Sequence, residues 1–512
     1  MNRSKKFMYN TIASAFQQLA LFAVGLVMPR IILQYYGSVV NGLTSSIQQF
    51  INNFYLVEAG VGASAIFALY KPIAQEDHKK ISSIVTAAQK FYIQTGYIFT
   101  ALVVALAFLF PFIRPTEALS KLDIGILVLA IGAPGSLNFF AISKYQAILT
   151  ADQRSYVISI AQMVGTIINA AVIIGMAYAG FSVVAGRTVA ILAIIARMII
   201  MTVYSKRRYP YLDFHARPDK SAMNQRWDAL YYQILGSIQI AMPTILATIF
   251  ISYEAVSVYT IFYMVIGGIN GILGIYTSGL SASFGDIIAR GEKKTLQKTY
   301  QEFECSYYTI ITVIYAVALV LIMPFIKIYT RGVTDANYNV PIVGYLMVIN
   351  GFLYNLKTPQ SMLLISAGLY KPTRVQTTIQ ASILVVAGAA LAPVMGLPGI
   401  LIGCILSNLY RCIDLLFFIP KHVTGLSPAL TLKRWGYSLL SFLLILLPFF
   451  FVTVEAPGYM SWIVSAVWAT IYAVAVALLV GYICDRQVMA DAVVRMIRMI
   501  GFKNFGKKKG PA

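Results

Sequence analysis

Long apolar stretches separated by short polar connections run through almost the whole chain of 512 residues. A helix of about 20 apolar residues crosses a hydrocarbon core of about 30 Å. The stretches do not show the alternation over roughly ten residues that is typical of membrane strands. Their approximate positions are 8–35, 42–69, 84–111, 122–149, 156–178, 182–204, 228–251, 256–281, 303–328, 339–366, 375–395, 399–420, 436–453 and 459–482. The pattern predicts an all-α polytopic membrane protein with about 14 transmembrane helices.

Composition supports this prediction and excludes an ordinary soluble protein, because 59% of the residues are hydrophobic, 12% are charged and the mean hydropathy is +0.74. The apolar stretch after residues 1–6 is too long for a cleaved signal peptide, so we expect an uncleaved first helix. The four cysteines have no metal-ligand spacing. No GxSxG, P-loop, HExxH or CxxC motif occurs in a suitable context. We therefore expect no metal, no cofactor and no enzymatic activity.

The basic residues are distributed unevenly between the connections. With an even number of spans both termini lie on one side, and the segments on that side hold 29 of the 40 Lys and Arg residues. The opposite side holds four, which are Arg114, Lys121, Lys327 and Arg331. This bias predicts that both termini are cytoplasmic. Because it accounts for most of the net charge of +21, nucleic acid is not the expected partner.

Three short segments recur, each with weak similarity, about 215 residues further along the chain, and this indicates an internal duplication. Residues 28–32 (MPRII) resemble 242–246 (MPTIL), and 148–151 (ILTA) resemble 364–367 (LISA). The third similarity pairs IA at 73–74 and a following KK with IA at 288–289 and a following KK. Six spans per repeat predict two pseudo-symmetric lobes in the same orientation. The predicted parts are a six-helix lobe at 1–204, a cytoplasmic connector at 205–227, a second six-helix lobe at 228–420, a terminal helix pair at 436–482 and a basic amphipathic tail at 485–512.

Seven basic side chains lie inside the predicted spans, and only Glu58 and Asp414 oppose them at similar depth. The seven are Arg30, Lys90, Lys144, Arg187, Arg197, Lys357 and Arg411. A charge near the bilayer centre costs roughly 2.5–3.5 kcal/mol, so such residues usually face a wet cavity or a partner. The excess of positive charge predicts an anionic substrate.

Arg30 follows Pro29, which is expected to bend the first helix. An inward-facing guanidinium there forms a forked donor for phosphate oxygens, and the alternative is snorkelling to the outer headgroups. Lys357 lies near the middle of the tenth span, where its side chain reaches neither interface easily, and this favours a cavity. Arg411 and Asp414 share a helical face, which suits a structural pair as well as a binding or switching role.

The remaining charged candidates carry two interpretations each. Glu58, near the polar residues Gln48 and Asn52, either lines water and carries a coupling ion or joins helices by hydrogen bonds. For Lys144 and Arg187, as for Lys90 and Arg197, snorkelling is favoured over substrate binding because they lie near the membrane faces. The candidate substrate-binding cations are Arg30, Lys357 and Arg411, with Lys144 and Arg187 kept as further candidates, and Glu58 and Asp414 are the candidate coupling or structural acids.

Part of the chain resembles the Wzx/RfbX-type polysaccharide flippases of the MOP (multidrug/oligosaccharidyl-lipid/polysaccharide) exporter superfamily. The resemblance rests on EAGVG at 58–62, LYKP at 69–72, the charged loop at 76–80 and ADQ at 151–153 with SY at 155–156. It implies a MATE-like two-lobed helical transporter with a central cationic cavity. In related lipid II flippases, arginines of the first, second and eighth helices line the cavity. Here Arg30 alone matches, which argues against lipid II as the substrate.

The resemblance implies alternating-access flipping of undecaprenyl-pyrophosphate-linked oligosaccharides from the cytoplasmic to the outer leaflet of the bacterial plasma membrane, for cell-surface or capsular polysaccharide. The expected partners are this substrate, membrane lipids, a coupling ion (H⁺ or Na⁺) and other polysaccharide-assembly proteins. One alternative is a cation-coupled multidrug or small-molecule exporter of the same superfamily, although such exporters favour carboxylates and the first span carries Arg30 instead. A membrane polysaccharide polymerase or ligase ranks third, because no large outer loop is predicted to carry catalytic groups.

Overall fold

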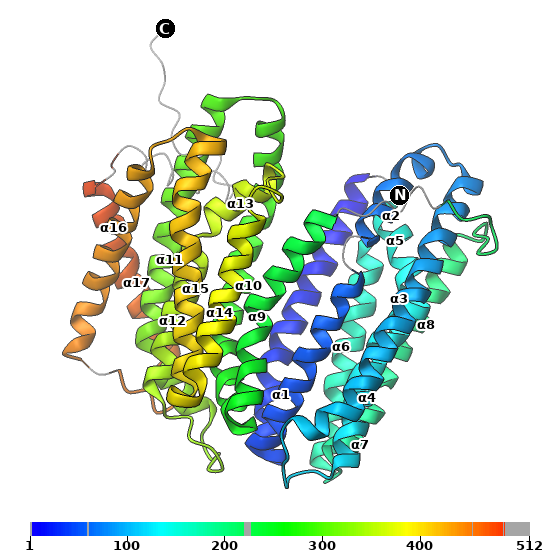
Figure 1. Ribbon diagram of the computed structural model, residues 1–512, viewed down its shortest axis with the longest axis horizontal. Helices are drawn as coiled ribbons and strands as arrows, with labels where there is room; N and C mark the ends of the chain where they lie inside the picture. Colours follow the sequence, from blue (N-terminus) through cyan, green and yellow to red (C-terminus); the bar gives the residue numbers. More distant parts are fainter. Residues whose placement is uncertain (1–2, 59–60, 220–226, 453, 485, 487–512) are drawn as a thin grey trace. The chain divides into compact units, whose positions relative to one another are not determined.

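The computed structural model describes residues 3–58, 61–219, 227–452, 454–484 and 486 (Figure 1). Within these residues the chain forms helices and no β-strand. In the described part of the chain, twelve helices are long and apolar enough to cross a membrane. Two further predicted spans are interrupted. The second begins within α1 (Arg3–Phe54) after a kink and continues into α2 (Val61–Ala74), and the tenth is divided into α12 (Pro341–Leu356) and α13 (Thr358–Ser366). The prediction of a multi-pass all-α membrane protein with about 14 spans is therefore confirmed.

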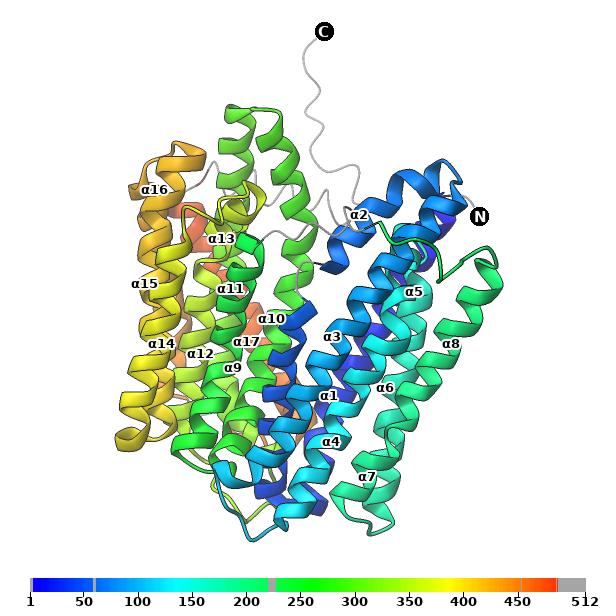
Figure 2. The same cartoon turned by 45° about the vertical axis from the view of Figure 1, so that its right-hand side comes forward.

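The chain divides into two compact units, and unit 1 comprises residues 1–260 and 332–336. After α1 and α2, its helices are α3 (His78–Ile113), α4 (Lys121–Leu137), α5 (Ser143–Ala151), α6 (Ser155–Tyr178), α7 (Val183–Val189), α8 (Leu192–Arg208) and α9 (Trp227–Phe250), with short turns η1 (Tyr55–Glu58) and η2 (Asn138–Ile142). Figure 2 shows α3, α4, α6 and α8 as neighbours within this unit. The fully buried Leu43, Phe99, Phe110 and Phe139 belong to its apolar core.

The helix α1 consists of two segments joined at Gly37, which adopts φ 81° and ψ 174°. The first segment runs parallel to α6, because Lys6 contacts Asp152 near the beginning of α6 and Tyr36 donates to the Phe181 carbonyl beyond its end. The second segment runs antiparallel to α3, with Phe50 against Phe110 and Phe54 against Phe99. A positive φ is readily adopted by glycine, so Gly37 allows the first two spans to follow each other without a loop.

The described part of the predicted connector, residues 205–219, packs on α3. The side chains of Ser82, Ser83 and Thr86 donate to backbone carbonyls of the connector. His78 stacks on Tyr211, with 3.8 Å between the ring centroids. This segment is therefore held on the surface of unit 1.

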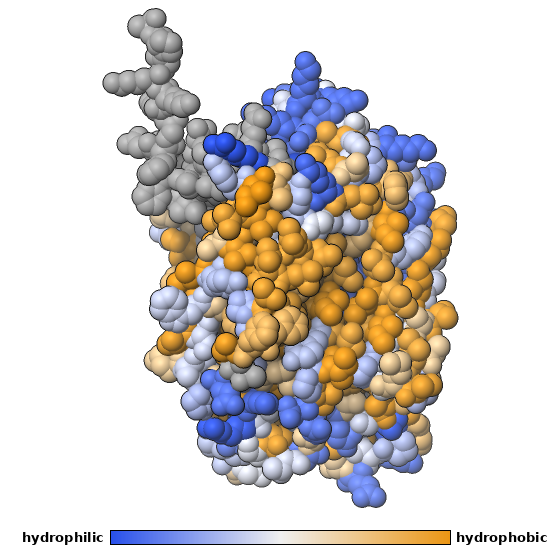
Figure 3. All heavy atoms as spheres, turned by 90° about the vertical axis from the view of Figure 1, so that its left-hand side faces the viewer, coloured by the Kyte–Doolittle hydropathy of each residue, from blue (hydrophilic) through white to orange (hydrophobic). Residues whose placement is uncertain are grey.

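Unit 2 comprises residues 261–331 and 337–512, as far as they are described. It contains most of α10 (Tyr253–Ala289), together with α11 (Lys293–Tyr329), α12, α13, α14 (Arg374–Met395), α15 (Leu397–Ile419), α16 (Pro428–Leu446) and α17 (Tyr459–Cys484). The helices α16 and α17, predicted as a terminal pair, pack on each other and on α11. On the face of this unit shown in Figure 3, apolar side chains form a band between hydrophilic ends, as expected of a surface in contact with lipid.

The border between the two units lies within α10, because α9 and the beginning of α10 pack on α1. The hydroxyls of Ser46 and Thr248 are 2.7 Å apart, and the Asn41 amide donates to Ser257 at the same distance. The predicted lobes at 1–204 and 228–420 remain a prediction, as does the assignment of the connector and the terminal pair. The predicted amphipathic tail at 485–512 lies outside the described residues, apart from Arg486.

Candidate functional site

The break in the tenth span places Lys357 between α12 and α13 in unit 2. Pro359 lacks an N–H, so it cannot continue the hydrogen-bond ladder to the carbonyl of Asn355 four residues earlier. Within membranes, interrupted helices occur where the backbone is buried in protein or lines a cavity, and in transporters they often form binding sites. The sequence predicted Lys357 at mid-span, but it did not predict this break.

Lys357 is 8% exposed and donates a hydrogen bond to the amide oxygen of Asn408 on α15. The Asn408 amide in turn donates to Asn350 on α12 at 2.9 Å. The Lys357 Nζ also lies 4.8 Å from the ring centroid of Tyr354. An ammonium has three N–H donors, and within the described part of the chain none of them reaches a carboxylate.

Arg411 and Asp414 form an ion pair on α15 with an N–O distance of 2.6 Å, in agreement with their predicted shared face. Arg411 is 2% exposed, and its Nη2 has no hydrogen-bond acceptor among the described residues. Arg411 also interacts electrostatically with Lys357. Among the described residues, this part of unit 2 therefore holds two basic side chains for one carboxylate.

In unit 1, Arg30 is half-buried on the first segment of α1. The helix continues through Pro29, and its departure from helical geometry is at Gly37, about two turns further on. Arg187, on α7, interacts electrostatically with Tyr36, and its Nε is buried without an acceptor among the residues described. Both arginines remain candidates for binding an anion.

Lys144 has a different environment. Its Nζ lies 4.5 Å from the ring centroid of Phe214 in the connector and 5.2 Å from that of Tyr145. Such cation–π contacts stabilise a charged side chain without a carboxylate. They favour the interpretation in which Lys144 extends toward the membrane face, rather than substrate binding.

Glu58 ends η1 and interacts electrostatically with Tyr55 and Tyr92. The neighbouring polar residues form hydrogen bonds within their own helix, because Gln48 donates to Asn52 and Asn53 donates to the Gln49 carbonyl. These bonds do not join helices. Whether Glu58 itself binds a coupling ion remains a prediction.

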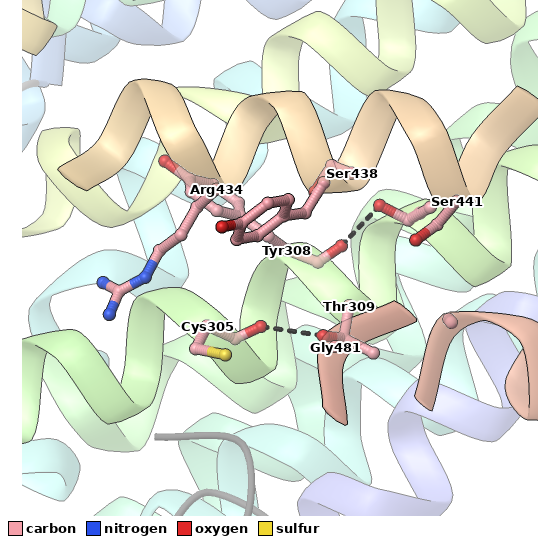
Figure 4. Close-up of a pocket in the computed structure, with 10 residues that line it drawn as sticks. Cys305, Tyr308, Thr309, Arg434, Ser438, Ser441 and Gly481 are labelled. Atoms are coloured by element: carbon pink, nitrogen blue, oxygen red, sulfur yellow. Dashed lines mark hydrogen bonds between the residues drawn. The ribbon is translucent and has the colours of Figure 1, made fainter. Parts of the chain in front are cut away.

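A buried ion pair that was not predicted from the sequence joins Glu304 on α11 to Arg434 on α16. Glu304 is 0% exposed, and its second oxygen, Oε2, accepts from Arg434 at 2.6 Å. Its Oε1 accepts from four neutral donors, which are Tyr300, Tyr308, Gln360 and Thr431. Figure 4 shows the adjoining pocket, where Arg434, Ser438 and Ser441 of α16 face α11. The spacing of Tyr300, Glu304 and Tyr308, one turn apart, was the signal that could have revealed it.

A wider apolar cavity of about 950 Å³ lies in unit 2 between α11, α12 and the end of α16. Lys327 and Glu455 are the charged residues among its lining. Among the described residues, no group of three or more His, Cys, Asp or Glu side chains is arranged to hold a metal ion.

No protein-family model matches the chain, and no curated protein matches it. Solved structures of similar fold do exist. The lipid II flippase MurJ in an inward closed conformation is 13% identical, with a TM-score of 0.68 over 94% of this chain and 100% of that one. An inward-facing multidrug resistance MATE family transporter of the MOP superfamily is 15% identical, with a TM-score of 0.64 over 80% of this chain and 95% of that one. A MATE protein in the bent conformation is 15% identical, with a TM-score of 0.56 over 85% and 98%. The chain therefore has the fold of the MOP-superfamily transporters.

Proposed function

We propose that the protein is a flippase that moves undecaprenyl-pyrophosphate-linked oligosaccharides from the cytoplasmic to the outer leaflet by alternating access. The observation that carries this proposal is the burial of two basic side chains, Lys357 and Arg411, in unit 2, where the acid beside them among the described residues is Asp414, which is paired with Arg411. A diphosphate would supply the missing negative charge, and its oxygens accept charge-assisted hydrogen bonds. The fold shared with a lipid II flippase is consistent with a lipid-linked substrate.

In this proposal, the candidates for binding the diphosphate are Lys357 and Arg411 within unit 2, and Arg30 and Arg187 are the candidates within unit 1. Lys144 contributes least, because its charge is already placed against two aromatic rings. Asp414 keeps Arg411 in position, and Glu58 is the other of the two acids predicted to bind a coupling ion. The Wzx/RfbX-type assignment belongs to the same proposal, and so does a plasma-membrane location with both termini in the cytoplasm.

A multidrug exporter is the second candidate, because MATE transporters share the fold. The two candidates differ in the charge of their substrates. Basic side chains that outnumber the acids beside them repel a cationic drug and attract a diphosphate when they are protonated. The burial of Lys357 and Arg411 beside a single acid therefore favours the flippase.

Reconstitution tests this proposal directly. The purified full chain is placed in liposomes with undecaprenyl pyrophosphate that carries one N-acetylglucosamine, and the fraction in each leaflet is followed with an impermeant sugar-oxidising reagent. We expect the protein to speed transfer between the leaflets, and undecaprenol bearing the same sugar without phosphate should not be moved. Equal transfer of the phosphate-free lipid would contradict the charge argument, and transport of ethidium instead would favour the multidrug exporter.

A further inference from the structure

Among the described residues of unit 2, Lys357 differs from the other buried charged side chains because the acids near it are already paired with arginines. Asp414 binds Arg411 and Glu304 binds Arg434, each at 2.6 Å. Within the described residues, the hydrogen-bond acceptor of Lys357 is a neutral amide oxygen. A buried ammonium without a counter-ion is costly. The side chain nevertheless reaches no interface, since it is 8% exposed at the break of the tenth span.

The elements packed around Lys357 do not provide a further compensating charge. Among the described residues, the titratable groups on these elements include Tyr354 on α12, Arg411, Cys412 and Asp414 on α15, and Glu304, Tyr307, Tyr308 and Tyr315 on α11. Two of these are carboxylates and both are paired with arginines. The phenols are neutral near neutral pH, and the Cys412 thiol donates to the Leu353 carbonyl at 3.4 Å. Arg411 itself adds positive charge beside Lys357.

Lysine, unlike arginine, can release this charge. A buried lysine loses its proton readily, whereas a guanidinium stays protonated in proteins. The resulting amine still has two N–H donors, so its hydrogen bond to Asn408 remains possible. A proton also needs no cavity, whereas a diphosphate cannot reach a side chain that is 8% exposed until the helices move.

We propose that Lys357 is the proton-binding site that couples transport to a proton gradient, an inference that rests on the proposed flippase function. In the conformation described here the side chain is the neutral amine. When the break between α12 and α13 opens to water, the amine takes one proton from that water and becomes the ammonium, which binds the diphosphate. Release of the same proton to water on the other side restores the amine and removes the charge that holds the anion.

Coupling follows from the different energies of the two forms. The charged form needs water or an anion and therefore favours an open site, while the neutral form is compatible with the closed one. A group that binds one state better shifts the equilibrium toward that state. The other predicted coupling ion, Na⁺, is disfavoured at this position because Lys357 and Arg411 would repel it.

The test measures conformation as a function of pH without any substrate. Spin labels are attached to Arg207→Cys in unit 1 and Lys294→Cys in unit 2, both exposed positions, in a Cys484→Ser background. The three remaining cysteines, Cys305, Cys404 and Cys412, are buried and should not react. Double electron–electron resonance spectroscopy then reports the distribution of distances between the two labels in liposomes. We expect this distribution to shift between acidic and alkaline pH in the parent protein.

Two variants separate a proton site from a structural role. Lys357→Met should hold the distribution seen at alkaline pH, and Lys357→Arg should hold the one seen at acidic pH, each without a further pH response. Lys327→Met, at an exposed lysine of the same unit, should keep the parent response. If either substitution at 357 prevents folding, Asn408→Asp supplies a counter-ion instead and should move the transition to more alkaline pH.

A distribution in the parent that does not change with pH would overturn the proposal. So would a full pH response in both Lys357→Met and Lys357→Arg, or an unmoved transition in Asn408→Asp. The leaflet-transfer assay with the N-acetylglucosamine-bearing lipid distinguishes this failure from failure of the proposed function. Transfer without a pH response rejects the proton site alone, whereas a pH response without transfer rejects the substrate alone.

Discussion

The carboxylate of Asp335 accepts two hydrogen bonds from Ser38, one from its backbone N–H at 2.5 Å and one from its hydroxyl at 2.7 Å, although 297 residues separate the two positions. Ser38 begins the second segment of α1, directly after the kink at Gly37. The first N–H groups of a helix have no partner within the helix, and a negative charge there is favourable. Asp335, which belongs to unit 1 although the chain on either side of 332–336 belongs to unit 2, thus caps a helix far away in the sequence.

We expect Asp335→Ala to destabilise the protein, because a helix cap of this kind contributes about 0.5–2 kcal/mol. Asp335→Asn should cost less, since an amide oxygen can still accept one bond from Ser38. The measurement is the thermal unfolding of the purified protein in detergent. Glu117→Ala, which removes an exposed acid, serves as the control, and an equal effect of this control would show that the cap contributes nothing.

Gly37→Ala provides an independent check of the same turn. Its φ of 81° disfavours a side chain, and an added Cβ would lie 2.8 Å from the Asp335 carboxylate oxygen. The variant should therefore be destabilised by at least the 1 kcal/mol or so typical of a non-glycine residue at positive φ. Gly25→Ala, at a position with open space around it, should have almost no effect. Similar stability of the two variants would contradict the conformation at Gly37.

A second prediction concerns the Glu304–Arg434 pair that joins α11 to α16. Arg434→Met leaves a fully buried carboxylate without its cation, and breaking a buried pair in this way costs about 3–5 kcal/mol. The double change Glu304→Gln and Arg434→Met removes both charges and should recover much of this loss. Thermal unfolding of the wild type, both single variants and the double variant gives the coupling energy. Additive effects would show that the two side chains do not interact.

The span pattern could be predicted from the sequence because each helix must present about 20 apolar residues to lipid, a local property of the chain. The interruption at Lys357 was missed because the apolar residues on both sides of 357–361 (KTPQS) were joined into one span, although Pro359 was a visible signal of a break. The partners of Glu304 and Ser38 were missed for another reason. A helical pattern shows which face a residue occupies, but it does not identify a residue 130 or 297 positions away on the opposing element.

The candidate cations were also only partly predictable. The ion pair between Arg411 and Asp414 followed from their spacing on one helix. The aromatic rings around Lys144 did not, because Phe214 comes from the connector, whose packing against the helices cannot be read from its sequence. Arg434 was counted among loop charges because it lies just before an apolar run, yet it is 3% exposed. A charged residue at the edge of a span can belong to an exposed loop or be buried in an ion pair, and the sequence does not distinguish these two cases until its partner is known.

The third prediction is a pH dependence at the beginning of α6. Asp152 accepts hydrogen bonds from Lys6 at 2.7 Å, Arg154 at 2.6 Å and Tyr209 at 2.8 Å. Burial alone would raise the pKa of the Asp152 carboxyl, but these hydrogen bonds outweigh it and hold the pKa below its usual value. A carboxylate with a lowered pKa in the folded state stabilises the protein above its unfolded pKa of about 3.9. This stabilisation is lost as the pH falls through the folded-state pKa.

Asp152→Asn should therefore lower the unfolding temperature relative to the wild type at neutral pH, and the difference should shrink below about pH 4. Thermal unfolding of both proteins over a pH series is the measurement. Glu292→Gln, which changes an exposed carboxylate without a side-chain cap bond, should differ little from the wild type over the whole series. A difference between Asp152→Asn and the wild type that stays constant with pH would show that the carboxylate charge is not what stabilises this contact.

The last prediction addresses the arginines proposed to bind the diphosphate. Each contributes charge-assisted hydrogen bonds worth about 1.5–3 kcal/mol where water is partly excluded. Arg30→Ala and Arg411→Ala should therefore slow export about ten- to a hundredfold, because 1.4 kcal/mol corresponds to a factor of ten. Compared with Arg30→Ala, Arg30→Lys should recover little of the export rate if the contact with phosphate is bidentate, and most of it if charge alone matters. Lys206→Ala, at an exposed basic residue of the connector, should leave the export rate almost unchanged.

Export is best measured as surface polymer in cells depleted of their own flippase, with the abundance of each variant determined in the same membranes. Arg411→Ala also leaves Asp414 without its partner, so Asp414→Asn combined with Arg411→Ala distinguishes loss of the binding charge from the cost of an unpaired acid. If binding is the role of Arg411, the double variant stays as slow as the single one at equal abundance. Recovery of export in the double variant would assign Arg411 to structure, and near-normal export from a variant lacking Arg30, Lys357 and Arg411 together would remove the case for an anionic substrate.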